Sequence, residues 1–472
     1  MSALWLVMKP IDSKGSPFTQ KVRRSALGAP RAPGRKWQQQ GKRVKRPDPR
    51  RWVRGAPAPN LTAVGGLAEF AAFCRTEGIE EQLSEQFGAM KTGPGVVYPM
   101  EAQMRLLIDA AMVGIPRVFG LEGMACDPLF TLLAGGAIPS IDTVYRDLQR
   151  FEPVTLERLE KLMAEQGLAL VRDAGLQQLT LDIDSTVMEA FGEQQYAAVG
   201  YNPRYRGRRS YHPVIARVAE TDTVIGARLR PGNTTFGQAD VEDIEWWLDQ
   251  ARQAAPSALI TVRMDRAGDA VSVLEAIDRK GALFVVKMTQ TSNLLQAAMA
   301  QQHWQTIEQD ADGNPIAQVA ELSFKRNEWR PGQFRVIALR DRHRDNGRQM
   351  PLWPALDYSV RFYVTNDRIH SPEQIALSYD RRAGIETLIR EGKDAFGIGK
   401  MPCYSFDANE AAMLIKLLAH NLLRRWVVKR LPPQVHHWRA SWIRKLAIHV
   451  PARLLRSSRQ WILRLAPRPM LN

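Results

Sequence analysis

The chain has 472 residues, of which 45% are hydrophobic, so it is long enough for several domains and at least one large core. No continuous apolar run approaches the roughly 20 residues that a transmembrane helix needs, and the first residues lack the layout of a signal peptide. The sequence therefore argues against a membrane-spanning or secreted protein.

The charge of the chain is unevenly distributed. The 65 basic and 49 acidic residues give a formal net charge of +16, yet residues 61–420 hold 38 basic and 47 acidic residues. Residues 1–60 hold 15 basic and 2 acidic residues, and residues 421–472 hold 12 basic residues and no acidic one. Two basic ends on an acidic body favour binding to a polyanion, because each neutralised phosphate releases counterions. We expect nucleic acid, with a membrane surface as the rival polyanion.

The cysteines give little functional information. Cys74, Cys126 and Cys403 lie far apart and are not clustered with histidines. They predict neither a disulfide framework nor a zinc site, and a reducing cytoplasmic compartment is the simplest inference.

The first part of the chain divides into an arm and a helical region. Residues 1–60 are rich in Lys, Arg, Pro, Gly and Gln and predict a disordered basic arm. Residues 61–175 show helical periodicity, in which Met104, Ile108 and Met112 belong to one apolar stripe.

Two short helices are predicted within residues 126–151, separated by a turn that contains glycine and proline. Ser140 is a good N-cap for the second helix, which would carry Arg146 and Arg150 on one side. This layout allows a helix-turn-helix that reads DNA, and simple packing of two helices is the alternative. We therefore interpret residues 61–175 as a helical DNA-binding domain.

Residues 176–289 change to the alternation of a sheet. Leu179, Leu181 and Ile183 alternate with polar residues, as in a strand with one polar face. Three strands, a helix and then alternating strand and helix are the order of a ribonuclease-H-like mixed sheet of the α/β class. The predicted strands cover residues 179–187, 212–219, 223–229, 258–264 and 283–288, and the predicted helices cover residues 239–254 and 270–279.

The remainder of the chain is predicted to contain three further parts. Residues 290–368 are β-rich and irregular, and we interpret them as an insertion into the core. Helices resume in residues 369–430, which are expected to complete the core. Residues 431–472 predict a basic tail formed by a pair of amphipathic helices. The strands expected in the insertion cover residues 316–322, 333–339 and 360–365.

Four residues near the end of the core share one helical stripe. Tyr379, Arg382, Glu386 and Lys393 lie at offsets that fall within roughly 60° on an ideal helix, with Leu388 roughly opposite. A carboxylate flanked by two cations and a phenol suits a metal-bound phosphate. The alternative is a solvated helix face with an ordinary i,i+4 ion pair.

Two further acids follow predicted strands. Asp184 and Asp265 each lie at the carboxyl end of a strand, where ligands gather in open mixed sheets. Together with Glu386 they supply the oxygen ligands that two hard divalent cations need when they bridge a phosphodiester. Asp182 faces the same side of the strand as Asp184 and competes with it for the metal, whereas Asp265 could instead be a helix cap.

These motifs resemble the bacterial insertion-sequence transposases of the DDE class that carry a Tyr-x2-Arg-x3-Glu-x6-Lys signature. The signature is matched by Tyr379, Arg382, Glu386 and Lys393 without a gap, and Asp184 precedes a small hydroxyl residue as the first acid of the family does. The resemblance covers about residues 65–465. Further matches lie at residues 200–203, 210–213, 265–269 and 450–454.

The resemblance implies a ribonuclease-H-like core that contains a β-rich insertion and follows a helical N-terminal domain. It also implies cleavage with two Mg²⁺ ions, which Mn²⁺ can replace, and transfer of the freed 3′-hydroxyl into target DNA. Arg382 and Lys393 would hold phosphates, and Tyr379 would hold the terminal one. The implied partners are double-stranded DNA, comprising the terminal inverted repeats and the target, and a second copy in a DNA-bound homodimer. Trp329 and Trp353 are candidates for the tryptophan with which some members hold a flipped base.

A basic loop is predicted between the first two strands of the core. It carries Arg204, Arg206, Arg208 and Arg209, which could follow a DNA backbone near the active edge. A solvated charged loop is the alternative.

Three functions remain open at this point. The first hypothesis is a cytoplasmic, nucleoid-associated transposase. The second is a metal-dependent DNA nuclease of the same fold that does not join strands, and the third is a non-catalytic DNA-binding descendant. The intact order of Asp184, Asp265 and Glu386 argues against the third.

Overall fold

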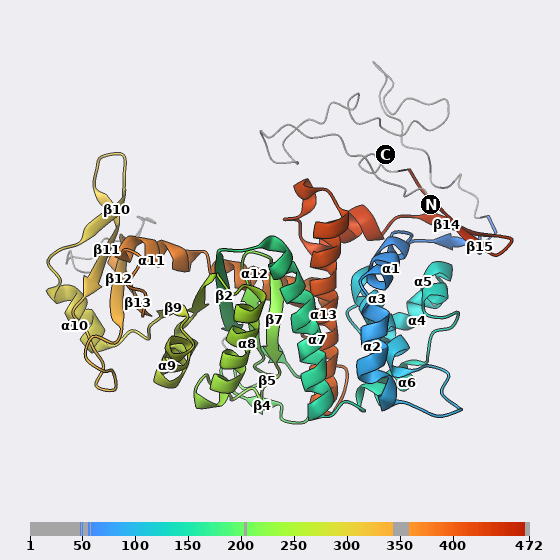
Figure 1. Ribbon diagram of the computed structural model, residues 1–472, viewed down its shortest axis with the longest axis horizontal. Helices are drawn as coiled ribbons and strands as arrows, with labels where there is room; N and C mark the ends of the chain where they lie inside the picture. Colours follow the sequence, from blue (N-terminus) through green and yellow to red (C-terminus); the bar gives the residue numbers. More distant parts are fainter. Residues whose placement is uncertain are drawn as a thin grey trace, which may run out of the picture.

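Figure 1 shows the computed structural model of the chain, which describes residues 58–202, 205–342 and 358–467 together with residues 48, 50, 55 and 56. The basic arm expected at residues 1–60 therefore lies almost entirely outside the described residues. Arg204 and Trp353 also lie outside them.

The N-terminal region is helical, as its periodicity predicts. The two short helices expected within residues 126–151 are present as α5 and α6, and the Ser140 hydroxyl accepts the backbone N–H of Thr143 at 3.3 Å, as an N-cap does. The helices are α1 (Leu67–Thr76), α2 (Ile79–Phe87), α3 (Met100–Val113), α4 (Leu121–Met124), α5 (Pro128–Leu133), α6 (Ile141–Leu148) and α7 (Pro153–Ala174).

A nine-stranded mixed sheet forms the centre of the protein, with strand order β10-β11-β12-β13-β9-β8-β2-β6-β7. Strands β2, β8 and β9 run parallel, whereas β6 and β7 pair antiparallel on the other side of β2. The five strands predicted for the core are all present. They are β2 (Gln178–Ser185), β6 (Val214–Val218), β7 (Thr223–Arg228), β8 (Leu259–Met264) and β9 (Leu283–Lys287).

The β-rich insertion extends this same sheet. Strand β13 pairs antiparallel with β9, so the inserted strands continue the hydrogen-bonded ladder of the core. All three predicted strands are present, and the sequence did not predict α10 (Ser292–Ala300) or β10. The inserted strands are β10 (Gln305–Gln309), β11 (Pro315–Leu322), β12 (Arg335–Arg342) and β13 (Tyr358–Thr365).

Helices cover both faces of the sheet because β2 alternates in polarity. Leu179, Leu181 and Ile183 pack with α8 (Val241–Ala254) and α9 (Val271–Arg279) in one apolar cluster. The opposite face of β2 carries Asp182 and Asp184 and lies under the helices of the C-terminal half. Those helices are α11 (Pro372–Asp380), α12 (Ala383–Glu391) and α13 (Phe406–Arg430).

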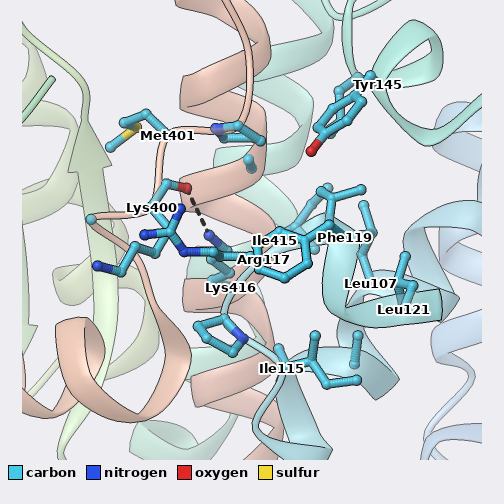
Figure 2. A pocket seen from close by; sticks show the side chains of 18 of the residues that line it. Leu107, Ile115, Arg117, Phe119, Leu121, Tyr145, Lys400, Met401, Ile415 and Lys416 are labelled. Carbon is cyan, nitrogen blue, oxygen red and sulfur yellow. Dashed lines mark hydrogen bonds between the residues drawn. The ribbon is translucent and has the colours of Figure 1, made fainter. Parts of the chain in front are cut away.

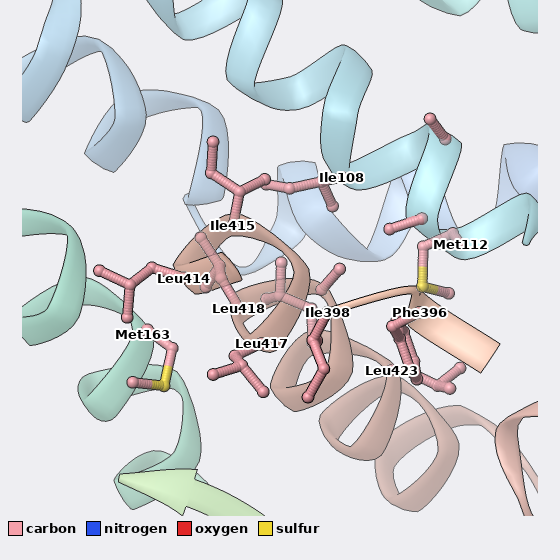
Figure 3. Packing of buried hydrophobic residues seen from close by; sticks show 14 of the residues in the cluster. Ile108, Met112, Met163, Phe396, Ile398, Leu414, Ile415, Leu417, Leu418 and Leu423 are labelled. Carbon is pink, nitrogen blue, oxygen red and sulfur yellow. The ribbon is translucent and has the colours of Figure 1, made fainter. Parts of the chain in front are cut away.

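The helix α13 joins the sheet to the N-terminal helices. Figure 1 shows it between α7 and α3, and Figure 3 shows Leu414 and Leu418 of α13 in one apolar cluster with Ile108 and Met163. Helix α13 also contacts β7 of the sheet. Because α7 contributes to this cluster and also packs on β7, the N-terminal helices and the sheet share buried surface.

The structure corrects the predicted tail, which is not a pair of helices. A short helix, α14 (Ala440–Ile443), continues as a π-helical turn, and an antiparallel hairpin of β14 (Ala452–Ser457) and β15 (Gln460–Leu465) follows. The residues of β14 alternate between buried and exposed at its start, so their apolar period is two. Strand β14 also pairs with β1 (Leu61–Thr62), which ties the two ends of the described chain together. Across the described residues, no helix combines the length and apolar character that a bilayer crossing requires.

Candidate active site

Two of the predicted acids lie at the same edge of the sheet. Strands β2 and β8 are parallel neighbours in which Ile183 is paired with Met264. Asp184, near the end of β2, and Asp265, directly after β8, therefore lie side by side. Asp184 accepts the backbone N–H of Ser185 at 2.9 Å, and Asp265 accepts that of Ala267 at 2.9 Å. The strand pairing therefore brings together two acids that are 81 positions apart in the chain.

The signature residues do not lie on one uninterrupted helix, which corrects the predicted stripe. Helix α11 ends at Asp380 and α12 begins at Ala383, and Lys393 lies in a π-helical turn, Gly392–Phe396. At the junction the N–H of Arg382 bonds the carbonyl of Tyr379 at 2.8 Å, a three-residue step that tightens the turn. Gly384 lies there too, and a glycine weakens a helix by about 1 kcal/mol.

Arg382 joins two of the three acids. Its guanidinium Nη2 lies 2.9 Å from Oδ1 of Asp184, and its Nη1 lies 3.7 Å from Oε1 of Glu386. The Arg382 and Asp184 side chains are only 6% and 12% exposed, whereas that of Glu386 is 69% exposed. Glu386 is therefore the acid that is free to change its orientation.

The pKa of Asp184 reflects its burial and the charged groups around it. Burial raises the pKa of Asp184 to about 6, Arg382 opposes that shift, and the carboxylates of Asp265 and Glu386 add to it. Burial likewise raises the pKa of Tyr379 to about 12, so this phenol stays protonated. A cation placed among the three acids would stabilise their ionised forms.

A cavity of about 490 Å³ opens at this edge. Asp265, Tyr379, Arg382 and Glu386 line it, and the side chains of Arg266, Lys287 and Arg361 add positive charge. No group of three or more His, Cys, Asp or Glu side chains is already placed to hold a metal ion in the part of the chain that the structure describes. Asp265 and Glu386 line the cavity, and Arg382 connects it to Asp184, which is not a lining residue.

Asp182 differs from Asp184 in its burial and in its hydrogen-bond partners. Its side chain is fully buried, and it accepts hydrogen bonds from Arg263 at 2.7 and 3.0 Å and from Arg217 at 3.2 Å. Burial tends to raise the pKa of Asp182, and the two guanidinium groups oppose that shift. Because both oxygens are already bound by arginines, Asp182 does not compete for a metal at the edge.

Tyr379 and Lys393 make contacts that the spacing alone did not predict. Tyr379 is 9% exposed, and its ring centroid lies 4.7 Å from that of Tyr363. The ammonium of Lys393 donates to Oγ1 of Thr186 at 2.6 Å and to the carbonyl of Val187 at 2.8 Å. Lys393 thus holds Thr186 and Val187, which directly follow the end of β2.

The basic loop after β2 is partly described. Arg206, Arg208 and Arg209 are exposed. The Arg208 guanidinium lies 3.9 Å from Glu189 and 4.8 Å from the ring centroid of Tyr205. A small sheet of order β3-β5-β4 supports the loop, and its strands are β3 (Met188–Glu189), β4 (Ala198–Val199) and β5 (Arg209–Tyr211).

Arg146 lies on α6 and Arg150 follows that helix, so both belong to the N-terminal helices and neither lies on the sheet. Arg146 and Arg150 are exposed, and Arg150 pairs with Asp147 at 2.9 Å. Trp329 is 5% exposed and packs against Phe324 and Phe334, so its ring is part of the core and is not open to a base.

Sequence reasoning missed several residues that shape this site. Arg263 and Arg217 hold Asp182, and Arg361 on β13 pairs with Asp341 and Asp380 at the cavity. The one available signal was that arginine recurs within otherwise apolar strands, where a buried cation needs a carboxylate partner.

A family model described as Transposase DDE domain group 1 matches residues 56–469. The chain therefore belongs to this family of DDE transposases. No curated protein sequence matches it.

Two solved structures are similar to the chain. One is piggyBac transposase in a synaptic complex with hairpin DNA, with 10% identity, a TM-score of 0.42, and coverage of 81% of this chain and 79% of that one. The other is Mos1 transposase in a paired-end complex with the left transposon end, with 12% identity, a TM-score of 0.18, and coverage of 38% and 59%.

Proposed function

We propose that this protein is an insertion-element transposase that cleaves DNA at the element ends and joins the freed 3′-hydroxyl to target DNA. The observation that carries the proposal is the meeting of Asp184 and Asp265 on neighbouring parallel strands, with Glu386 linked to Asp184 through Arg382. Membership of the DDE transposase family agrees with it. The signature of Tyr379, Arg382, Glu386 and Lys393 places the chain, in this proposal, in the group that carries it.

The central part of the sheet supports a ribonuclease-H-like core. Its strand order is β7-β6-β2-β8-β9, with the first three strands antiparallel and the last three parallel. Along the chain, these strands follow the predicted succession of three strands, a helix and then alternating strand and helix.

Asp184, Asp265 and Glu386 fit a pair of divalent cations, in our proposal Mg²⁺, which Mn²⁺ can replace. The fit rests on the donor set, which is three carboxylates. Burial raises the pKa of Asp184, and the charges of Asp265 and Glu386 add to that shift, so a cation beside them would favour the ionised form. When bound, such ions supply the activation of water or a 3′-hydroxyl and the stabilisation of the leaving oxygen. The exposed Glu386 can turn toward the other two acids.

Arg382 has a role of its own in this account. A guanidinium makes paired hydrogen bonds to a carboxylate or to a phosphate equally well, because the two anions have similar geometry. Arg382 compensates Asp184 and faces the cavity. We propose that Arg382 releases Asp184 and binds a DNA phosphate when divalent cations neutralise the carboxylates.

Lys393 acts differently from the role that the resemblance implies. Its bonds to Thr186 and Val187 hold the segment after Asp184, so we propose that it positions the edge of the site. Tyr379 lines the cavity with its ring 6.0 Å from the Arg382 guanidinium, where its hydroxyl can reach a phosphate.

Double-stranded DNA is the proposed partner, as terminal inverted repeats and as target, bound by a homodimer. Exposed cations support this on two surfaces, the loop with Arg206, Arg208 and Arg209 and the helix pair with Arg146 and Arg150. Arg204 and the basic residues of the arm add positive charge in the sequence and lie outside the described residues. Such contacts follow the phosphate backbone and carry no sequence information directly.

A strand-transfer assay with labelled element ends and Mg²⁺ tests the proposal. We expect the wild-type protein to give cleaved ends and joined products, and Asp184→Ala, Asp265→Ala and Glu386→Ala to give neither while still binding the ends. Cleavage without joined products would identify the nuclease alternative. Binding without cleavage by the wild-type protein would identify the non-catalytic alternative, and retained cleavage in any one variant would refute the assignment of that acid.

A further inference from the structure

A second cavity, of about 230 Å³, lies between the N-terminal helices and α13 (Figure 2). It shares no lining residue with the cavity at Asp265. Part of its wall is aromatic, from Phe119, which is 56% exposed, and from Tyr145 on α6, and Ile415 of α13 adds an aliphatic surface. Pockets for drug-sized ligands usually measure about 300–1,000 Å³. This cavity therefore suits a group about as large as a single planar ring system.

Three cations gather on one side of this cavity, opposite the apolar wall. Figure 2 shows Arg117, Lys400 and Lys416 close together there. The Lys416 ammonium donates to the carbonyls of Gly397 at 2.7 Å and Lys400 at 3.1 Å. Within the described ranges, none of the three cations has a carboxylate at ion-pair distance, which leaves their charge available to an anion.

The cavity carries an excess of positive charge that its own residues do not neutralise. Burial lowers the pKa of Lys416, and the charges of Lys400 and Arg117 act in the same direction, which brings the pKa to about 7. Glu189 is the carboxylate in the lining, and it lies 3.9 Å from Arg208, outside the three-cation group. An anion beside Arg117, Lys400 and Lys416 would remove this repulsion.

The cationic side of the cavity is built from closely packed backbone. Gly397 has a φ of +66°, and a Cβ there would lie 2.6 Å from the Cβ of Pro116. Only glycine allows the loop to approach Pro116 so closely, and the same residue presents its carbonyl to Lys416. The position of the Lys416 ammonium is therefore set before any ligand binds, which lowers the cost of binding.

The cavity also lies beside the candidate active site. A Cβ on Gly399, which lines the cavity, would lie 3.9 Å from Cγ of Lys393 and 3.9 Å from Cγ of Met188. Lys393 in turn holds Thr186, two residues after Asp184. Two chain segments thus connect the carboxylate edge directly to the wall of the cavity.

We propose that this cavity binds a single unpaired nucleotide, with the base against Phe119 and Tyr145 and the phosphate at Arg117, Lys400 and Lys416. A planar base with a charged phosphate matches an aromatic wall opposite unpaired cations, and every base can stack on an aromatic face. The inference deepens the proposed function and rests on it, because DNA held at the carboxylate edge would supply the nucleotide. A free nucleotide is the other source of the same chemistry.

The test is a binding measurement in EDTA with the full chain. Three probes are compared: a short duplex with one bulged 2-aminopurine, the same duplex with that base paired, and free dAMP as a competitor. We expect the bulged duplex to bind about tenfold more tightly than the paired one, since stacking of one base contributes about 1–3 kcal/mol. The 2-aminopurine fluorescence should fall on binding because the base stacks on an aromatic ring.

Two variants and a matched control separate the cavity from general charge effects. R117Q/K400Q removes two exposed cations of the cavity, and Phe119→Ala removes its exposed ring. R158Q/K161Q removes two exposed cations from α7, outside the cavity. The preference for the bulge should disappear in the cavity variants and persist in the control. Unchanged melting temperatures, expected because all the replaced side chains are exposed, exclude loss of folding.

The outcomes are distinct. If dAMP binds and the bulge gives no preference, and R117Q/K400Q removes dAMP binding, the cavity takes a free nucleotide and the assignment stands. If neither the bulge preference nor dAMP binding depends on the cavity variants, the assignment is overturned. Because no metal or cleavage is involved, failure here is independent of failure of the transposase activity, which the Mg²⁺ strand-transfer assay reports.

Discussion

Two aspartates two positions apart on β2 are expected to differ in their contribution to stability. We compare Asp182→Asn with Asp184→Asn, which make the same chemical change on the same face of the strand. Asp182 is fully buried between Arg263 and Arg217, whose side chains are 5% and 10% exposed. Asp184 lies at the edge and is 12% exposed.

The magnitudes follow from these surroundings. Removing one partner of a buried ion pair costs about 3–5 kcal/mol, because it leaves an uncompensated charge. Asp182→Asn leaves Arg263 without a carboxylate and Arg217 with Asp222 alone. Asp184 has a pKa of about 6 against an ordinary value of 3.8, so above that pKa its ionised form weakens the folded state. The shift corresponds to about 3 kcal/mol at most, which offsets the loss of a carboxylate beside Arg382, so Asp184→Asn is expected to leave stability nearly unchanged or to raise it.

The assay is thermal unfolding in EDTA near pH ~8, above the pKa of about 6 of Asp184. With roughly 2–4 °C per kcal/mol for a domain of 150–250 residues, Asp182→Asn should lower the melting temperature by about 10 °C. Asp184→Asn should melt at or above the wild-type temperature while losing cleavage. An equal loss of stability in both variants, or none in Asp182→Asn, would refute the separation of a structural from a functional aspartate.

Three further predictions concern the arm, a buried acid and a packing contact. Deletion of residues 1–55 should weaken DNA binding and reduce its dependence on salt without abolishing cleavage, and an unchanged salt slope would contradict a phosphate-binding arm. Burial raises the pKa of Glu160 to about 7 from 4.5, so its ionisation weakens the fold as pH rises through that window. The melting temperature of Glu160→Gln should therefore rise relative to that of the wild type between about pH 5 and pH 8. A difference that stays constant with pH would contradict this. A Cβ on Gly226 would lie 2.1 Å from the Trp247 indole, so Gly226→Ala should cost about 1–3 kcal/mol or more in denaturant unfolding. Gly123→Ala, which meets nothing within 4 Å, is the neutral control.

The strands of the core could be predicted from the sequence because their apolar residues follow the pattern of a strand. Leu179, Leu181 and Ile183 alternate with polar residues, and the structure buries all three on one face. Asp184 and Asp265 were found because each ends such a strand, and the strands are parallel neighbours. The family was recognisable because the signature spacing is specific and the two aspartate motifs precede it in order.

The sequence could not separate Asp182 from Asp184. The difference depends on Arg263 from β8 and Arg217 from β6, which reach Asp182 only after the sheet is assembled. Local spacing contains no information about such non-local partners. The same reason explains why the contact of Lys393 with Thr186, 207 positions away, was not predicted.

The two corrected elements have local explanations. The predicted helical stripe is interrupted after Asp380, since three-residue hydrogen-bond steps beside Gly384 replace the regular turn. The predicted helical tail is a hairpin because the alternation of Ala452, Arg453 and Leu454 has a period of two. A short run of apolar and basic residues fits both periods, and pairing with β1 decides between them.

The central claim is that Asp184, Asp265 and Glu386 together bind divalent metal at the edge of the sheet. The most direct measurement is the anomalous scattering of Mn²⁺ in crystals of the protein bound to element-end DNA. The account predicts Mn²⁺ peaks coordinated by oxygens of all three side chains, with Asp182 still bound to Arg263. Mn²⁺ bound to other residues, or an Asp184 still paired with Arg382 and carrying no metal in a complex that cleaves DNA, would contradict it.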